Sequence, residues 1–95
     1  MNCLELIAKI DSISHLRYSP AGIPVVDFML IHESAAVEAD KSRKIQLKLK
    51  SIAIGILAEK VCNFQLGSTW FFNGFLSSSQ NMKSITYHVQ EIHTV

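Results

Sequence analysis

Apolar and polar residues alternate along much of the chain, and a period of two is typical of β-strands. The clearest case is the segment 44–50, in which Ile45, Leu47 and Leu49 alternate with three lysines and a glutamine. One face of this strand should therefore pack in the core, and the other should be basic. The same period, or an enrichment in β-branched and aromatic residues, predicts five strands in all, over residues 4–10, 25–31, 44–50, 69–76 and 85–90.

The connections between these strands carry different signals. Residues 17–24 contain two prolines and a glycine, which favour an ordered turn. Residues 35–42 are small and charged, without an apolar period, and predict an exposed hairpin loop, as does the polar run 77–81. Between the third and fourth strands, apolar residues recur every three or four positions, which predicts a short amphipathic helix over residues 56–63. Gly74 lies within the fourth strand and indicates a bulge or a tight bend.

This order of elements predicts an all-β protein. Five strands with a helical connection between the third and fourth match the five-stranded OB-fold barrel, although periodicity alone does not separate it from other small barrels. With 95 residues, the chain should form a single OB-fold domain over residues 1–95.

Composition and charge limit the possible settings. The chain is 48% hydrophobic, which favours self-association of so small a domain, and its net charge of +1 gives no general affinity for nucleic acid. The charged N-terminal segment does not resemble a signal peptide, and no apolar run is long enough to span a bilayer. Together with Cys3 and Cys62, which are far apart in the sequence, this predicts a cytoplasmic protein with free thiols and no membrane association.

The basic face of the third strand is the strongest candidate for a binding surface. Alternate side chains of a strand lie about 6.6–7 Å apart, close to the repeat of a nucleotide backbone, so Lys44, Lys48 and Lys50 have the spacing to follow phosphates. Lys41 and Arg43 precede them and would extend the row through the predicted loop. The alternative is an ordinary solvated edge in which lysines only maintain solubility.

The aromatic residues are weaker candidates for stacking on bases. Trp70 shares a strand face with Phe72 and Gly74, which favours burial over an exposed stacking platform. Phe71, on the opposite face, and Tyr87 remain possible platforms, although half-buried packing is the commoner role of such residues.

No pattern of catalytic or metal-binding residues is present. The four histidines are scattered over different strands and no C-x-x-C pair occurs, so no metal site and no cofactor is expected. Cys62 has no base paired with it, and no phosphate-binding glycine loop occurs. We therefore expect a protein that is not an enzyme.

Residues 17–28 read R-Y-S-P-A-G-I-P-V-V-D-F and are followed by Leu30 and His32-Glu33-Ser34. This run resembles the primosomal replication protein N (PriB) family, in which an S/T-P-x-G-I-P turn leads into a strand with a similar L-x-H-x-S end. Gly67-Ser68 with Gly74-Phe75-Leu76-Ser77 and the closing Gln90-Glu91-Ile92 are similar to the family's last two strands.

This resemblance implies an OB fold, a homodimer related to half of a single-stranded-DNA-binding tetramer, and a partnership with the restart helicase and other primosome proteins. The chain departs from the family at two positions. Some members carry several lysines in the hairpin between strands four and five, where residues 77–84 offer only Lys83. On strand three, Gln46 stands where a member has an exposed aromatic residue.

The sequence thus predicts a single-stranded-DNA-binding accessory protein of the primosome that acts in replication restart. The alternative is an OB-fold protein-protein interaction module with weak nucleic-acid binding, which the nearly neutral charge and the lysine-poor hairpin favour. The predicted nucleic-acid-binding residues are Arg17, Tyr18, Lys41, Arg43, Lys44, Lys48, Lys50 and Lys83.

Overall fold

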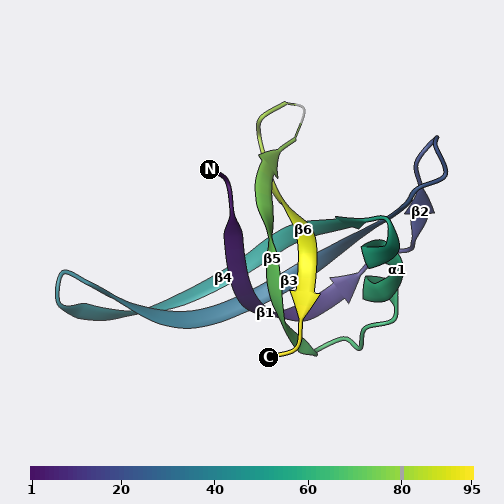
Figure 1. Cartoon of the computed structure of the whole chain (residues 1–95). Helices are drawn as coiled ribbons and strands as arrows, with labels where there is room; N and C mark the ends of the chain where they lie inside the picture. The colour runs from purple at the N-terminus through teal and green to yellow at the C-terminus, as the bar shows by residue number, and fades with distance from the viewer. Residues whose placement is uncertain (80) are drawn as a thin grey trace.

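The computed structural model describes residues 1–79 and 81–95 and contains six strands and one helix (Figure 1). The elements, in chain order, are β1 (Leu4–Ile13), β2 (Arg17–Tyr18), β3 (Pro24–Glu38), β4 (Lys41–Ile54), α1 (Ile56–Cys62), β5 (Thr69–Ser78) and β6 (Ile85–His93). The five predicted strands and the helix are confirmed. The two-residue β2, within the predicted turn segment, was not expected. The predicted loop 77–81 begins too early, because Ser77 and Ser78 still pair with β6, and Gln80 lies outside the described residues.

The strands form one sheet that closes into a barrel. Their order is β1-β5-β6-β4-β3-β2, and a further pairing of β1 with β3 joins the two sides. β1 serves both neighbours because it changes partners along its length: residues 4–9 pair with β5, and residues 9–13 pair with β3. All neighbouring pairs are antiparallel except β4 with β6. The fold is an all-β, five-stranded OB barrel with a short helix between its third and fourth long strands.

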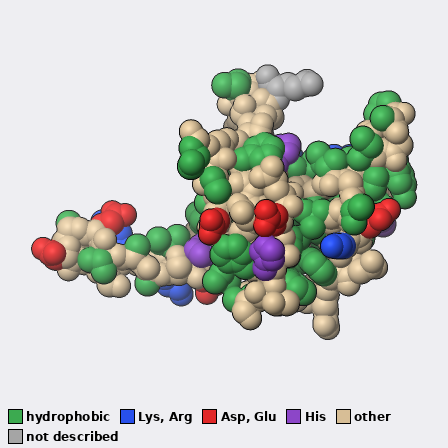
Figure 2. Space-filling view, in the orientation of Figure 1, with side chains coloured by type: hydrophobic (Ala, Val, Ile, Leu, Met, Phe, Trp, Pro, Cys, Tyr) green, Lys and Arg blue, Asp and Glu red, His purple; other side chains and the backbone are tan. Residues whose placement is uncertain are grey.

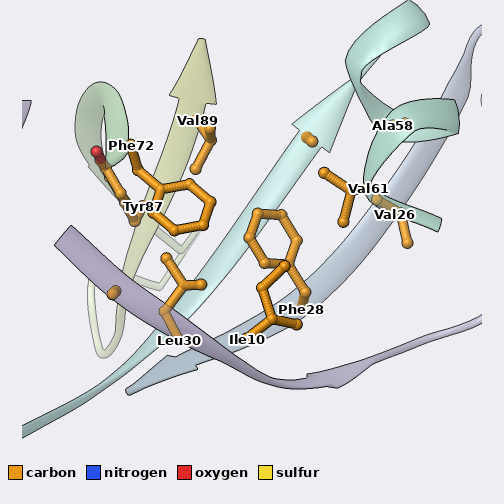
Figure 3. Packing of buried hydrophobic residues seen from close by; sticks show 11 residues of the cluster. Ile10, Val26, Phe28, Leu30, Ala58, Val61, Phe72, Tyr87 and Val89 are labelled. Atoms are coloured by element: carbon orange, nitrogen blue, oxygen red, sulfur yellow. The ribbon is translucent and has the colours of Figure 1, made fainter. Parts of the chain in front are cut away.

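The barrel interior holds an aliphatic and aromatic core (Figure 3). Inward side chains alternate along each strand as the period of two predicted, and α1 covers one end of the barrel with Ala58 and Val61. Phe28 and Phe72 lie near the middle, with ring centroids 6.3 Å apart in a tilted arrangement. Tyr87 is also fully buried, and its hydroxyl donates a 2.7 Å hydrogen bond to the carbonyl oxygen of Leu4.

The β3–β4 hairpin extends well beyond the barrel (Figure 1). The prediction of a loop over residues 35–42 is wrong: strand pairing continues to Glu38 and Lys41, and only Ala39 and Asp40 form the turn. Both turn residues have positive φ, as the tight two-residue hairpin turn requires. We call residues 33–47 the arm; none of them is buried.

The arm also changes the expected role of the aliphatic face of β4. Leu49 is partly buried against the core, but Leu47 is 46% exposed because its part of β4 has left the barrel. The prediction that the whole aliphatic face packs in the core is therefore wrong at Leu47 and also at Ile45, which lies on the arm outside the core cluster.

Gly74 marks a bulge, as its place in the strand predicted. The register between β5 and β6 shifts between Asn73 and Gly74. A Cβ atom at Gly74 would lie 2.0 Å from the carbonyl oxygen of His88, so the two backbones can approach this closely only at a glycine.

Candidate nucleic-acid interface

The lysines of β4 lie on the outer surface of the barrel and the arm. Lys48 and Lys50 alternate with Leu49 and with the buried Ser51, so their side chains leave the barrel on its outer side. Across the strand pair, Lys50 lies beside Met29 and Lys48 beside Ile31. Lys44 continues the row onto the arm. The lysines thus border a strip of apolar side chains on β3.

β1 completes this surface from the other side. Lys9 pairs with Ile31 and Ser12 pairs with Met29, so each apolar residue of β3 has a polar neighbour on both sides. Lys9 was missed by the sequence analysis, although its alternation with the inward Ala8 and Ile10 was the available signal. The basic face, as we use the term, consists of Lys9, Lys44, Lys48 and Lys50 with Met29 and Ile31 between them.

Two acidic side chains lie on this outer face: Glu33 of β3, which pairs with Gln46 between Lys44 and Lys48, and Asp11 of β1. Asp11 occupies the irregularity in β1 where the pairing with β3 shifts between Ile10 and Ser12. Its carboxylate lies 3.6 Å from the Lys48 ammonium, and both side chains are partly exposed. Asp11 therefore competes with any anion for Lys48.

Lys41 and Arg43 do not continue the row. They share the parity of Ile45 and Leu47, so they lie on the opposite face of the hairpin from Lys44. The Arg43 guanidinium also lies 3.5 Å from a carboxylate oxygen of Glu38. The expectation that Lys41 and Arg43 extend the row rests on a loop at this position. The strand in fact continues, and its alternation places Lys41 and Arg43 on the face opposite Lys44.

The remaining predicted site residues lie on other elements. Arg17 and Tyr18 form β2, where Arg17 makes an ion pair with Asp27 and Tyr18 is 63% exposed. Lys83 lies in the connection between β5 and β6, on a hairpin that projects separately from the arm (Figure 1). The surface over β5 and β6 displays acidic and histidine side chains rather than lysines (Figure 2).

The aromatic residues are mostly engaged within the protein. Trp70 is half-buried, as expected. Its ring stacks on that of Phe64, with 4.4 Å between the ring centroids, and its indole Nε1 donates a 2.8 Å hydrogen bond to the Ser68 hydroxyl. Tyr87 cannot serve as a stacking platform because it is fully buried, which corrects the expectation from sequence. Burial, with smaller contributions from Cys3 and Glu5, raises the pKa of the Tyr87 hydroxyl to about 12. Phe71 is half-buried, and its ring is tilted against the His93 ring, with 6.2 Å between the ring centroids.

A small pocket opens beside Lys50. It has a volume of about 240 Å³ and lies between the irregular part of β1 and the start of β3, with Ser12, Ile13, Asp27 and Met29 among its walls. Within residues 1–79 and 81–95, no group of three or more histidine, cysteine, aspartate or glutamate side chains is placed so that it could bind a metal ion. No helix in the described part of the chain has the length and apolar character needed to cross a membrane.

Comparison with known proteins identifies the family of this chain. The model of a family described as "another single-strand binding protein family" matches residues 2–91. The replication restart protein PriB of Bordetella pertussis is 32% identical over 96 aligned residues, which cover 100% of this chain and 90% of that protein. This chain belongs to the PriB family.

Solved structures show how far the PriB likeness extends. The structure of PriB from Ralstonia solanacearum matches with a TM-score of 0.89 and 26% identity, covering 99% of this chain and 97% of that one. The single-stranded DNA binding protein of Thermus aquaticus matches with a TM-score of 0.79 at 20% identity and covers 100% of this chain but 50% of that one. The latter likeness shows a shared OB fold. The resemblance inferred from the sequence motifs is confirmed.

Proposed function

We propose that this protein binds single-stranded DNA on the basic face and acts as an accessory protein of the primosome in replication restart. The observation that carries the proposal is the row of outward lysines on β4, at strand spacing, on the barrel surface that OB folds commonly use for oligonucleotides. The names of its relatives, replication restart proteins, support the cellular role.

Binding of this kind depends mainly on charge. The lysines attract phosphates, and the apolar strip of Met29 and Ile31 between them leaves room for bases to lie against the barrel. The candidate contacts are lysines and apolar side chains rather than side chains arrayed to read base edges, so little sequence discrimination is expected. The protein would act by affinity and assembly rather than by catalysis, presenting DNA, or itself, to the restart helicase.

The active unit in this proposal is a homodimer formed along β1. Residues 4–8 pair with β5 but not with β3, which leaves one side of the strand open. Ile7 is 47% exposed beside this opening. The His32 ring forms a 2.6 Å hydrogen bond with the Ile7 carbonyl oxygen, so this one carbonyl is already occupied although no strand pairs with residues 4–8 on this side. Leu47, opposite His32 on the hairpin, adds a second exposed aliphatic side chain. An open strand edge flanked by apolar side chains favours pairing with a second copy.

The proposal is tested by titrating a fluorescently labelled oligo-dT and a blunt duplex of equal length, following anisotropy at several salt concentrations. We expect tighter binding to the single strand, with an affinity that falls steeply as salt rises. Equal affinity for duplex would count against binding on the barrel face.

A second candidate function is a protein-interaction module with weak DNA binding. Asp11 on the basic face and the single lysine of the β5–β6 connection favour it. Binding to oligo-dT that is weak and nearly independent of salt, in a protein that still assembles with primosome proteins, would support this alternative.

A further inference from the structure

The pocket beside Lys50 arises from the irregularity in β1. Where the pairing with β3 shifts after Ile10, β1 moves away from a regular course, and Ser12 comes to pair with Met29. The gap that results is bounded by Ile13 and Met29 as apolar walls and opens next to Lys50. Its volume of about 240 Å³ is below the usual range for drug-sized ligands, about 300–1,000 Å³, and suits a single heterocycle.

The polar groups at the rim are suited to a nucleotide. The side chains of Ser12 and Lys50 have no hydrogen-bond or ion-pair partner within the described part of the protein. By contrast, the Asp27 carboxylate forms an ion pair with Arg17. The Ser14 hydroxyl donates a 2.9 Å hydrogen bond to the Asp27 carbonyl oxygen, so both of these side chains already have partners within the protein. A hydroxyl that can donate or accept and an unpaired ammonium therefore remain at the rim of an apolar pocket.

We propose that this pocket holds one base of the bound single strand, with the adjoining phosphate on Lys50. This inference rests on the proposed function and adds to it a defined base subsite. The base would lie against the Met29 thioether, a polarisable group that packs well against aromatic rings. Continuity with the basic face supports this occupant, because Lys50 and Met29 belong both to the basic face and to the wall of the pocket.

The Ser12 hydroxyl has no fixed donor or acceptor role, so the pocket should accept different bases. The subsite would thus add base-dependent affinity without strong sequence preference. Without it, the lysines alone would bind a phosphate backbone equally well with or without bases.

The test compares oligo-dT with an oligomer of the same length whose sites are abasic, so that both carry the same phosphates. We expect the wild-type protein to bind oligo-dT more tightly. Met29→Ala should weaken oligo-dT binding about fivefold, at the low end of what a stacked base contributes, and leave the abasic oligomer and the salt slope unchanged. Met82→Ala, at an exposed methionine of the β5–β6 hairpin, is the matched control and should change neither affinity.

A second variant guards against loss of packing at Met29. Ser12 is exposed, so Ser12→Leu fills the pocket opening without touching the core, and it should also weaken oligo-dT binding alone. If the wild-type protein binds both oligomers equally, or if the two folded variants bind oligo-dT as well as the wild type, the base subsite is wrong while electrostatic DNA binding stands. If neither oligomer binds the wild-type protein, the proposed function fails as well.

Discussion

At the scale of single residues, Lys48 and Lys50 separate binding from folding. Both project outward from β4, so Lys48→Ala with Lys50→Ala should leave the core intact while removing two phosphate contacts. The slope of log affinity for oligo-dT against log salt should fall by about 1.4, since each contact with a single strand contributes about 0.7. Lys60→Ala, on α1 and outside the basic face, is the control. An unchanged slope in the folded double variant would place the DNA elsewhere on the protein.

Asp11 gives a prediction of opposite sign. Its carboxylate neutralises part of the Lys48 charge and repels phosphates, so Asp11→Asn should strengthen binding to oligo-dT. The gain should be a few-fold at low salt, corresponding to about 1 kcal/mol or less for an exposed pair, and should shrink as salt is added. Asp40→Asn at the tip of the arm removes the same charge away from Lys48 and should have a smaller effect. Weaker binding by Asp11→Asn would contradict this arrangement.

Tyr87 links stability to pH. Its hydroxyl has a pKa of about 12 in the folded protein and about 10 in an unfolded chain, so the folded state holds the proton more tightly. The stabilisation is complete below about pH 10 and is lost as pH rises through about 12. Urea denaturation should therefore show the advantage of wild type over Tyr87→Phe, about 0.5–1.5 kcal/mol for the hydrogen bond to Leu4, shrinking across this range. A constant difference up to pH 12 would be inconsistent with a buried, protonated hydroxyl.

Alternation placed the lysines of β4 correctly, because strand parity is local information. It fails for Lys41 and Arg43 because their segment has the composition of a loop, and alternation defines two faces only in a strand. The burial of Tyr87 depends on how β6 meets β4 and β1, which no local pattern records.

At the scale of elements, the β3–β4 hairpin is buried in the barrel at one end and exposed in the arm at the other. Leu30 is fully buried where β3 lines the barrel, so Leu30→Ala should lower the free energy of unfolding by about 2–5 kcal/mol. Leu47 is 46% exposed, and Leu47→Ala should cost about 0.5 kcal/mol or less in the monomer. Urea titrations of both variants under dilute conditions check this contrast. A loss above 2 kcal/mol for Leu47→Ala would mean that the arm packs on the barrel.

The arm is also the element that the sequence predicted least well. Residues 35–42 have no apolar period because they leave the barrel and bury nothing, so the signal that marks a strand is missing. The helix and the bulge at Gly74 were predictable because each has a local cause. Apolar residues recur every three or four positions in the helix, and a glycine stands inside a strand at the bulge.

At the scale of the whole molecule, closure of the barrel follows from β1 pairing with both β3 and β5. Period and turn signals predicted five strands, but their order in the sheet depends on pairings between residues far apart in the chain, such as Leu4 with Gly74. The motif resemblance, rather than periodicity, distinguished the OB fold from other small barrels. The basic face could be anticipated on β4, and alternation alone could have placed Lys9 on an outer face. The position of Lys9 beside Ile31, the contact of Asp11 with Lys48 and the pocket depend on the three-strand arrangement.

The extended arm bears on how the backbone behaves in solution. A two-stranded hairpin without a core is marginally stable in water, so the amide hydrogens of residues 33–47 should exchange with deuterium much faster than those of the barrel portions of β3 and β4. If a second copy covers Leu47 and the open side of β1, this exchange should slow as protein concentration rises, while exchange in the barrel stays the same. Mass spectrometry of exchange at two concentrations would then distinguish an arm that opens freely from one that is held by its own dimer.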